Sequence, residues 1–457
     1  MTGVLIENCA VVTMDGAGTA GAEYTSGHVL LDGGRIVAVG QGPCDPALLP
    51  GDVQRVDGTG CVATPGLVNT HHHLYQWLTR GLAADATLFE WLTTLYPVWA
   101  GITADDVRTA ALGGLAQLAL GGCTTTTDHH YVVPRDAGDV FAAEISAAAE
   151  VGLRFHPSRG SMDLGRSDGG LPPDSVVEST DAILAGTAEV IDRFHDASPD
   201  SMCRIAVAPC SPFSVTGDLL RASAELARER GVRLHTHLAE TDDEEVFCRE
   251  RFGRTPMEYM ESVGWVGPDV WFAHTVHLDD AAIAAMAAGG MGAAHCPVSN
   301  GRLGAGIARV SAMLAAGIPV GLGVDGAASN ESSVLWEEMH QALLLARGVG
   351  GPRAMDVRTA LRMATVGGAR VLGRESEIGR LAPGYLADVA LWRLDTPALA
   401  GIDDPVAALV LGSQPPLRGL WVQGRRVVAD GRVVTVDAEE VSRDVVAARR
   451  RLLAKAG

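Results

Sequence analysis

Histidines at the ends of apolar segments are the first residues of this sequence whose type and spacing indicate chemistry. The segment PGLVNTHHH ends in His71, His72 and His73. Side chains two residues apart on a strand point to the same side, so His71 and His73 face one interior while His72 faces away. A pair of neutral imidazoles at this spacing suits a divalent metal. Taken alone, the motif also fits three polar residues that end a strand and share no ligand.

Three more apolar segments end in ionisable residues. LHTHLAE contains His237 and, three residues later, Glu240; FAH ends at His274; and GLGVD ends at Asp325. In barrels of parallel strands, the carboxyl ends of the strands carry the active site. Because four segments repeat the same placement, we expect one shared centre.

The segments between these residues predict how they are positioned. From about residue 66 to 380, strand-like pieces alternate with amphipathic helices, which is typical of βαβ units and a parallel sheet that closes into a barrel. One such helix follows Ile102, where Thr103 is the expected N-cap and Asp106 lies three residues on. The predicted fold class is therefore α/β, with a (β/α)₈ barrel over residues 66–380.

Both ends of the chain are rich in strand-like segments. Residues 4–13 and 28–39 are expected to form short strands around a Gly-Gly turn, and further β-like pieces follow residue 380. Each set alone would leave open sheet edges, so residues 1–65 and 381–440 are predicted to pair into one small β-sandwich. Residues 441–457 are predicted to form a terminal helix.

The motifs PGLVNTHHH, HTHLAE, AHTVH and GVDGAASN resemble the amidohydrolase superfamily, in particular its cytosine/guanine-deaminase-like branch. The resemblance extends over nearly the whole chain. It implies metal ligands at His71, His73, His237 and Asp325. It also implies that Glu240 is a proton shuttle, that His274 lies beside the reacting centre, and that Asp325 takes the proton of the attacking water.

The resemblance implies one divalent metal ion as cofactor. Such an ion lowers the pKa of water to about 7 and so supplies hydroxide at neutral pH. A single ion is expected because two-metal members of the superfamily bridge their ions with a carboxylated lysine, and Lys455 is the only lysine here. Zn²⁺ is the first choice, although imidazole and carboxylate ligands also suit Fe²⁺ or Mn²⁺.

Two stretches are expected to bind the substrate. The first is rich in aromatic residues and includes Gln76, Trp77 and Tyr96; the second begins at Arg159. An amide both donates to and accepts from the edge of a purine or pyrimidine, and an arginine binds an oxo group. Core packing explains the aromatic residues equally well.

These two stretches most resemble those of 8-oxoguanine deaminases, which convert 8-oxoguanine to urate and ammonia. Isocytosine deaminases and s-triazine amino- or chlorohydrolases are alternatives on the same scaffold. A catalytically inactive scaffold barrel is a remote alternative, because all the expected ligands and the shuttle are present.

Composition narrows the choice of partners. The net charge is −19 and no Lys or Arg stripe exists, which disfavours nucleic acid and anionic membranes and favours a small heterocyclic substrate. Eight scattered cysteines without a C-x-x-C pair indicate reduced thiols. With no signal peptide and no long apolar run, a cytoplasmic location is expected. A homo-oligomer is expected from the resemblance alone.

Two other motifs give weaker indications of function. Residues 321–326 fit the dinucleotide motif G-x-G-x-x-G, but Asp325 would repel a pyrophosphate. The segment CTTTTDHH is expected to be a buried strand, and whether His129 or His130 reaches the site is left open.

Overall fold

Eight parallel strands form a closed barrel in the computed structural model, which describes residues 3–16 and 21–456. In chain order, the barrel strands are β6 (Leu67–Asn69), β8 (Cys123–His130), β9 (Arg154–Ser161), β10 (Ala206–Pro209), β11 (Arg233–Leu238), β12 (Val270–His274), β13 (Gly292–His295) and β14 (Val320–Leu322). β14 pairs with β6 and closes the ring. The predicted (β/α)₈ barrel is thereby confirmed.

Local sequence explains individual barrel elements. All eight residues of β8 are buried, and its run of β-branched threonines favours an extended strand between two neighbours. The helix α2 (Ala104–Leu120) begins at the predicted N-cap: the Asp106 N–H donates to Thr103 Oγ1, and the Thr103 N–H donates to the Asp106 carboxylate.

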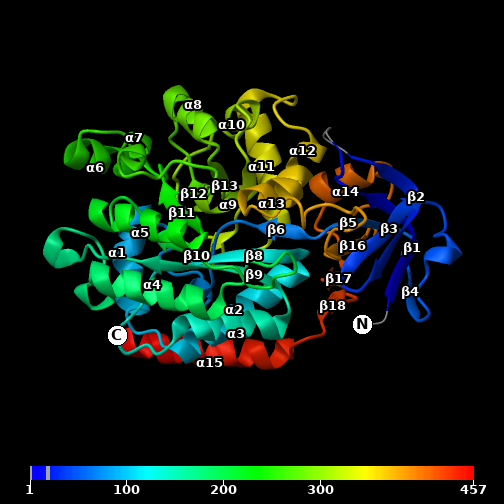
Figure 1. Ribbon diagram of the computed structural model, residues 1–457, viewed down its shortest axis with the longest axis horizontal. Helices are drawn as coiled ribbons and strands as arrows, with labels where there is room; N and C mark the ends of the chain where they lie inside the picture. Colours follow the sequence, from blue (N-terminus) through cyan, green and yellow to red (C-terminus); the bar gives the residue numbers. More distant parts are fainter. Residues whose placement is uncertain (1–2, 17–20, 457) are drawn as a thin grey trace.

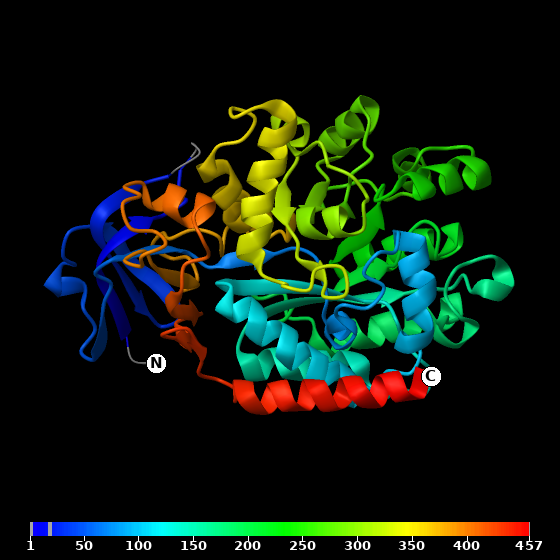
Figure 2. The same cartoon turned by 180° about the vertical axis from the view of Figure 1, so that it is seen from behind.

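Helices surround the barrel (Figures 1 and 2). Besides α2, they are α1 (Leu88–Trp99), α3 (Val140–Val151), α4 (Thr180–Phe194), α5 (Gly217–Arg230), α6 (Asp242–Phe252), α7 (Pro256–Ser262), α8 (Asp280–Gly289), α9 (Pro297–Arg302), α10 (Val310–Ala315), α11 (Leu335–Gly350), α12 (Val357–Arg362) and α13 (Gly368–Val371). In the described part of the chain, no helix has the length and apolar character that crossing a membrane requires.

Strands from both ends of the chain share a second, mixed sheet of nine strands. These are β1 (Gly3–Val12), β2 (Glu23–Asp32), β3 (Arg35–Gln41), β4 (Val53–Asp57), β5 (Cys61–Pro65), β16 (Val389–Arg393), β17 (Leu417–Val422), β18 (Arg425–Ala429) and β19 (Arg432–Val433). The two halves meet where β5 pairs antiparallel with β16. The prediction that both termini build one β domain is confirmed, and its hydrogen bonds run through a single continuous sheet.

The predicted Gly-Gly turn joins β2 to β3. Gly33 and Gly34 have φ values of 56° and 81°, a left-handed conformation that favours glycine. Residues 28–39 therefore form two antiparallel strands around this turn, as predicted.

The last two helices are α14 (Pro405–Leu411) and α15 (Ala438–Ala456). In Figures 1 and 2, α15 runs along the outside of the barrel past α2. Arg449 of α15 donates to the carbonyl oxygen of Leu78, at 2.8 Å, in the short helix η2 (Leu74–Thr79) that follows the first histidines. Of the predicted terminal segments, residues 1–2, 17–20 and 457 lie outside the described residues.

Candidate metal centre and active site

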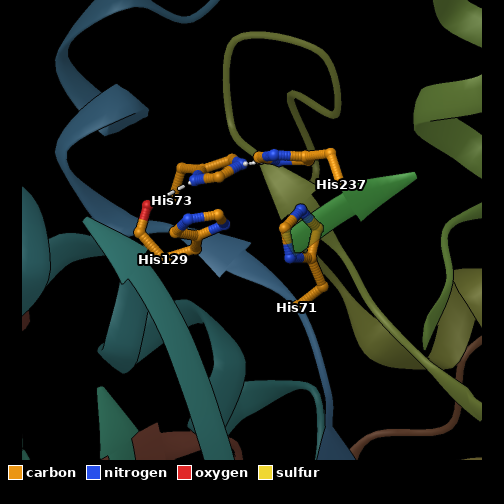
Figure 3. Close-up of side chains that lie close together, drawn as sticks. All are labelled: His71, His73, His129 and His237. Atoms are coloured by element: carbon orange, nitrogen blue, oxygen red, sulfur yellow. Dashed lines mark hydrogen bonds between the residues drawn. The ribbon is translucent and has the colours of Figure 1, made fainter. Parts of the chain in front are cut away.

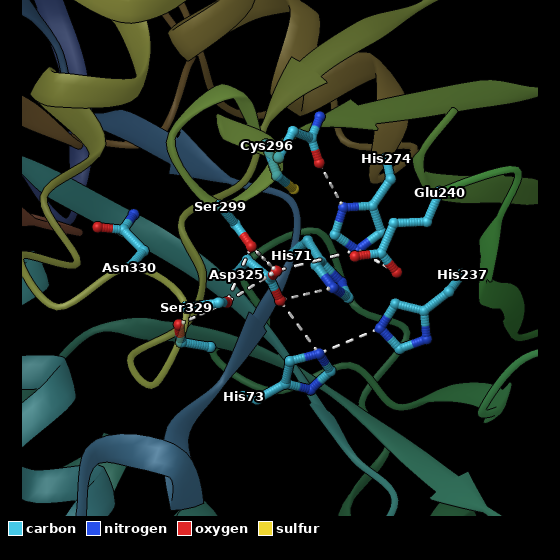
Figure 4. A network of polar contacts seen from close by, with 12 residues as sticks. His71, His73, His237, Glu240, His274, Cys296, Ser299, Asp325, Ser329 and Asn330 are labelled. Atoms are coloured by element: carbon cyan, nitrogen blue, oxygen red, sulfur yellow. Dashed lines mark hydrogen bonds and ion pairs between the residues drawn. The ribbon is translucent and has the colours of Figure 1, made fainter. Parts of the chain in front are cut away.

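The carboxyl ends of the strands bring four of the predicted residues together (Figure 4). His73 Nε2 lies 3.1 Å from His237 Nε2 and 3.2 Å from Asp325 Oδ1, and His71 Nε2 lies 3.3 Å from the same oxygen. All four side chains are buried. For ligands at about 2.0 Å from one ion, tetrahedral geometry separates the ligand atoms by about 3.3 Å. The four groups therefore fit a single cation.

Backbone pairing explains this convergence. Two short strands, β7 (His72–His73) and β15 (Asp325–Gly326), pair in parallel just beyond the barrel. The Asp325 N–H donates to the carbonyl oxygen of His71 at 3.1 Å. Asp325 has a φ of 60°, a left-handed conformation that costs a non-glycine residue about 1–3 kcal/mol. The pairing with β7 helps to hold this strained residue against His71.

Backbone carbonyl groups fix the tautomers of two histidines. The Nδ1–H of His73 donates to the carbonyl oxygen of His129 at 2.7 Å, which Figure 3 shows, and the Nδ1–H of His237 donates to that of Cys210 at 2.5 Å. A carbonyl oxygen only accepts, so the proton of each ring lies on Nδ1. The Nε2 lone pairs of His73 and His237 are consequently free to bind a metal.

His71 is oriented through a second histidine. The Nδ1–H of His235 donates to the carbonyl oxygen of Trp271 at 3.1 Å, so its Nε2 accepts the Nδ1–H of His71 at 2.8 Å. His71 Nε2 is buried and has no hydrogen-bond partner in the described part of the chain. Its free lone pair points to the cluster, as a metal ligand requires.

The charges of the cluster suit a divalent cation. Burial lowers the pKa of His71 and His237 well below the usual value, so both rings are neutral. Burial alone would raise the pKa of Asp325, but its close contacts with the ring nitrogens of His71 and His73 hold it well below its usual value. Its Oδ2 accepts from Ser299 Oγ at 2.5 Å. Neutral imidazoles and an ionised carboxylate are the ligands that zinc and similar ions bind.

His129 also reaches the centre, whereas His130 does not. The ring of His129 stacks on that of His237, with ring centroids 4.7 Å apart (Figure 3). Its donor nitrogen lies within 4.8 Å of those of His71, His73 and His237. His130 faces outward, where its Nδ1 lies 3.3 Å from the Glu144 carboxylate on α3.

Glu240 and His274 face each other beside the cluster (Figure 4). Glu240 Oε2 lies 3.6 Å from His274 Nε2, and His274 Nδ1 donates to Asn300 Oδ1 at 2.9 Å. Burial, together with the charge of Asp325, raises the pKa of Glu240 well above its usual value. The raised pKa favours the protonated form of this carboxyl group, which lies next to the metal cluster but outside it.

A second glutamate fixes the backbone that carries Glu240. The N–H groups of Ala239 and Glu240 donate to the two carboxylate oxygens of Glu244, at 2.9 and 3.1 Å. Ala239 has a φ of 51°. The buried carboxylate of Glu244 thus holds a strained turn that directs Glu240 into the site.

A narrow pocket adjoins the cluster. Its walls include Leu88, Trp91, Leu92 and Tyr96 of α1, with Phe213 opposite. His73, His237, Glu240, His274 and Asp325 also line it. The cavity volume is about 30 Å³, close to the share of one water molecule in the liquid. A larger molecule can enter only if the side chains of α1 move aside.

Gln76 places an unsatisfied amide in this pocket. Both amide atoms are buried and have no hydrogen-bond partner among the described residues. Gly326 makes room for this side chain, because a Cβ atom at residue 326 would lie 1.8 Å from Gln76 Oε1. Buried polar atoms are almost always paired, so the amide is available to a ligand.

A comparison with protein families identifies the chain. The model of the Amidohydrolase family matches residues 62–434. The chain belongs to the amidohydrolase family. As a member it is a hydrolytic enzyme acting on carbon–nitrogen bonds, and the histidine motifs lie within the matched residues.

Individual relatives cover almost the full length of this amidohydrolase. It is 45% identical to an 8-oxoguanine deaminase of Pseudomonas aeruginosa, over 92% of this chain and 93% of the relative. It is 38% identical to an isoxanthopterin deaminase of an unknown prokaryotic organism, over 98% and 97% of the two chains. The crystal structure of an atrazine chlorohydrolase from Arthrobacter aurescens complexed with zinc superposes with a TM-score of 0.92, at 34% identity, over 98% and 100% of the chains.

Two residues expected to bind substrate lie away from the pocket of this amidohydrolase. The indole of Trp77 packs on α2, where a Cβ atom at Gly113 would lie 2.4 Å from Trp77 Nε1. Trp77 follows Gln76 in η2 and points to the other side. Arg159 of β9 points outward and forms a two-fold ion pair with Glu178, at 2.8 and 2.9 Å. Of the four residues, Gln76 and Tyr96 line the pocket, and substrate binding by them stays a prediction.

Sequence reasoning assigned no role to several residues that the amidohydrolase brings to the site. His235 precedes His237 by two residues, so the strand spacing used for His71 and His73 would have found it. Cys210 follows β10 and contributes a carbonyl oxygen, whereas Ser299 and Asn300 of the short helix α9 contribute a hydroxyl and an amide; no recognisable spacing in the sequence marks these three residues.

Proposed function

We propose that this enzyme is a metal-dependent hydrolytic deaminase of a purine-like heterocycle, with 8-oxoguanine as substrate and urate and ammonia as products. The observation that carries the proposal is the position of the buried Glu240 carboxyl group, whose Oε2 lies 3.6 Å from His274 Nε2 beside the metal cluster. A deaminase must protonate a ring nitrogen and then the departing amine, which requires such an acid near the metal. The similarity to an 8-oxoguanine deaminase supports the choice of ring.

We assign the ligand set of one divalent cation, Zn²⁺ before Fe²⁺ or Mn²⁺, to His71, His73, His237 and Asp325. The Nε2 lone pairs of the three histidines and the lowered pKa of the Asp325 carboxyl group support this assignment. When bound, the cation supplies a Lewis acid that lowers the pKa of water to about 7. The zinc complex of the similar atrazine chlorohydrolase favours Zn²⁺.

The side chains then have separate tasks in the proposed reaction. Water adds its oxygen to the ring carbon that bears the amine, and Asp325 accepts the released proton. Glu240 donates its proton to the adjacent ring nitrogen. His274, with a proton on Nε2 as well as the one that Nδ1 donates to Asn300, stabilises the developing charge on the added oxygen. The carbon–nitrogen bond breaks as the amine takes the proton from Asp325 and leaves as ammonia. The added hydroxyl returns a proton to Glu240 and becomes the new carbonyl group of the ring.

Gln76 and Tyr96 are proposed to hold the ring. The Gln76 amide both donates and accepts, as the edge of an oxopurine does. Tyr96 belongs to the aromatic wall of α1, its hydroxyl 3.6 Å from Met162 Sδ. Because the cavity is small, the proposal requires α1 to move when the ring enters.

Glu240→Gln tests the role of the acid. We expect the variant to keep its metal content and lose most turnover, because the amide keeps the shape of the side chain without a transferable proton. Metal content is measured by elemental analysis and turnover by ammonia release. A variant with near-normal kcat would refute the assignment.

A substrate panel tests the ring and the leaving group. The panel comprises 8-oxoguanine, guanine, isocytosine, cytosine and hydroxylated triazines, each assayed for ammonia with metal-replete enzyme. The proposal expects the highest kcat/KM for 8-oxoguanine. A preference for a triazine, or release of a group other than ammonia, would instead support the relation to the atrazine chlorohydrolase.

A further inference from the structure

A second cavity lies at the amino-terminal end of the barrel strands, away from the metal centre. It has a volume of about 290 Å³. Its walls include Arg233 at the start of β11, Arg204 just before β10, His156, His195 and Trp271. None of these residues lines the catalytic pocket.

Four guanidinium groups lie around this cavity. The group comprises Arg154, Arg204, Arg233 and Arg374. Glu377 pairs with both Arg204 and Arg374, at 2.8 and 2.5 Å, and Asp388 pairs with Arg154 at 3.2 Å. Within the described ranges, Arg233 has no carboxylate oxygen within 4.0 Å. Asp269 and Glu375 act on Arg233 only at longer range, so its guanidinium remains available to an anion.

The neighbouring histidine responds to this charge. Burial lowers the pKa of His156 well below its usual value, and the four guanidinium groups lower it further. Such a site disfavours a second cation and favours an anion.

Two of the arginines keep unused donors. Arg204 Nε and Arg233 Nε are buried and have no hydrogen-bond partner in the part of the chain that the structure describes. Arg233 is oriented by the carbonyl oxygen of Pro268, which accepts from its Nη2 at 2.8 Å. Gly373, with a φ of 67°, lets the guanidinium approach, since a Cβ atom there would lie 2.8 Å from Arg233 Nη1.

We propose that this cavity is a binding site for a phosphate group, held by the guanidinium groups of Arg233 and Arg204. The planar fork of arginine matches a tetrahedral oxyanion, and each N–H···O bond to a charged oxygen is stronger than a neutral one. The volume admits inorganic phosphate as well as a small phosphate monoester. The site is independent of the proposed deamination.

Calorimetric titration of the metal-loaded enzyme tests the site. The probes are inorganic phosphate and glycerol 3-phosphate, each against sodium chloride of equal ionic strength. We expect binding of one or both probes, weakened about 10- to 100-fold in Arg233→Gln because a charged hydrogen-bonding partner is lost. The matched control is Arg228→Gln: Arg228 pairs with Asp269 at 3.0 Å and does not line the cavity. It should bind as the wild type does.

The outcomes separate this site from the metal centre. If phosphate binds at the metal centre, it should inhibit turnover equally in the wild type and in Arg233→Gln. If phosphate binds in the cavity, its calorimetric affinity should be lower for Arg233→Gln than for the wild type. Equal affinity of both proteins, or no binding by the wild type, overturns the proposal. If Arg233→Gln does not fold, wild-type crystals soaked in selenate decide: an anomalous peak within hydrogen-bond distance of Arg233 supports the site, and its absence refutes it.

Discussion

His235→Leu should weaken metal binding without removing any proposed ligand. His235 orients His71 through two hydrogen bonds. Its Nδ1–H donates to the Trp271 carbonyl oxygen at 3.1 Å, and its Nε2 accepts from His71 Nδ1 at 2.8 Å. Without it, the proton of His71 loses its acceptor on Nδ1. The ring then either keeps a buried N–H unpaired or moves the proton to Nε2, the atom that must bind the metal.

The expected loss of zinc affinity follows from these two states of His71. Leaving a buried donor unpaired costs about 1–3 kcal/mol, and loss of the partner of a metal-binding histidine lowers affinity about 10- to 100-fold. The two estimates agree, since tenfold corresponds to about 1.4 kcal/mol. We therefore expect the dissociation constant for Zn²⁺ to rise by one to two orders of magnitude.

Competition with a chromophoric zinc chelator measures this constant for His235→Leu, His235→Gln and His71→Ala. Gln is the matched control, because its amide oxygen can accept from His71 while its amide N–H₂ donates to Trp271, and it should restore much of the affinity. If His71→Ala weakens zinc binding but His235→Leu does not, the orienting role of His235 is wrong. If neither variant weakens binding, His71 is not a ligand and the proposed centre itself fails.

Two further predictions concern the pocket and the outer side of β8. Gly326→Ala should raise KM about tenfold or more while zinc content is unchanged, because its Cβ atom would displace the Gln76 amide; an unchanged KM would contradict the role of Gln76. Burial raises the pKa of Glu144 from 4.5 to about 8. Between pH 4.5 and pH 8, the folded protein therefore keeps a proton on Glu144 that the unfolded protein has lost. The free energy of unfolding consequently falls as pH rises through this range, by up to ~1.4 kcal/mol per pH unit. Glu144→Gln should therefore gain more stability over the wild type at pH 8 than at pH 5 in urea unfolding, and an equal gain at both pH values would count against the raised pKa.

The barrel and the residues of the centre were predictable because both depend on simple periodicity. Strand and helix periods alternate over most of the chain, and His71 and His73 lie two residues apart on one strand. The capping box of α2 was predictable for the same reason, since Thr103 and Asp106 interact locally. Where interacting residues lie only a few positions apart in the sequence, their spacing alone is enough to predict the contact.

The substrate-binding residues were harder to predict, because their direction depends on tertiary packing. Gln76 and Trp77 are neighbours in η2, yet one faces the pocket and the other packs on α2. Composition marks the segment as aromatic but does not assign its faces. Arg159 illustrates the same difficulty, because on β9 it faces the outer helices, where it pairs with Glu178.

The strand ends themselves show why periodicity stops at the site. Ala239, His274, Thr275 and Asp325 all have positive φ values, between 49° and 69°, at the ends of three barrel segments. A continued strand would alternate its side chains, whereas these left-handed residues turn the chain and bring Glu240, His274 and Asp325 to one point. Each such residue costs about 1–3 kcal/mol, and the Glu244 carboxylate and the β7–β15 pairing offset part of that cost. The residue types of the site predict its chemistry. The geometry of the site depends on strained backbone conformations, which hydrogen bonds from residues distant in the sequence maintain.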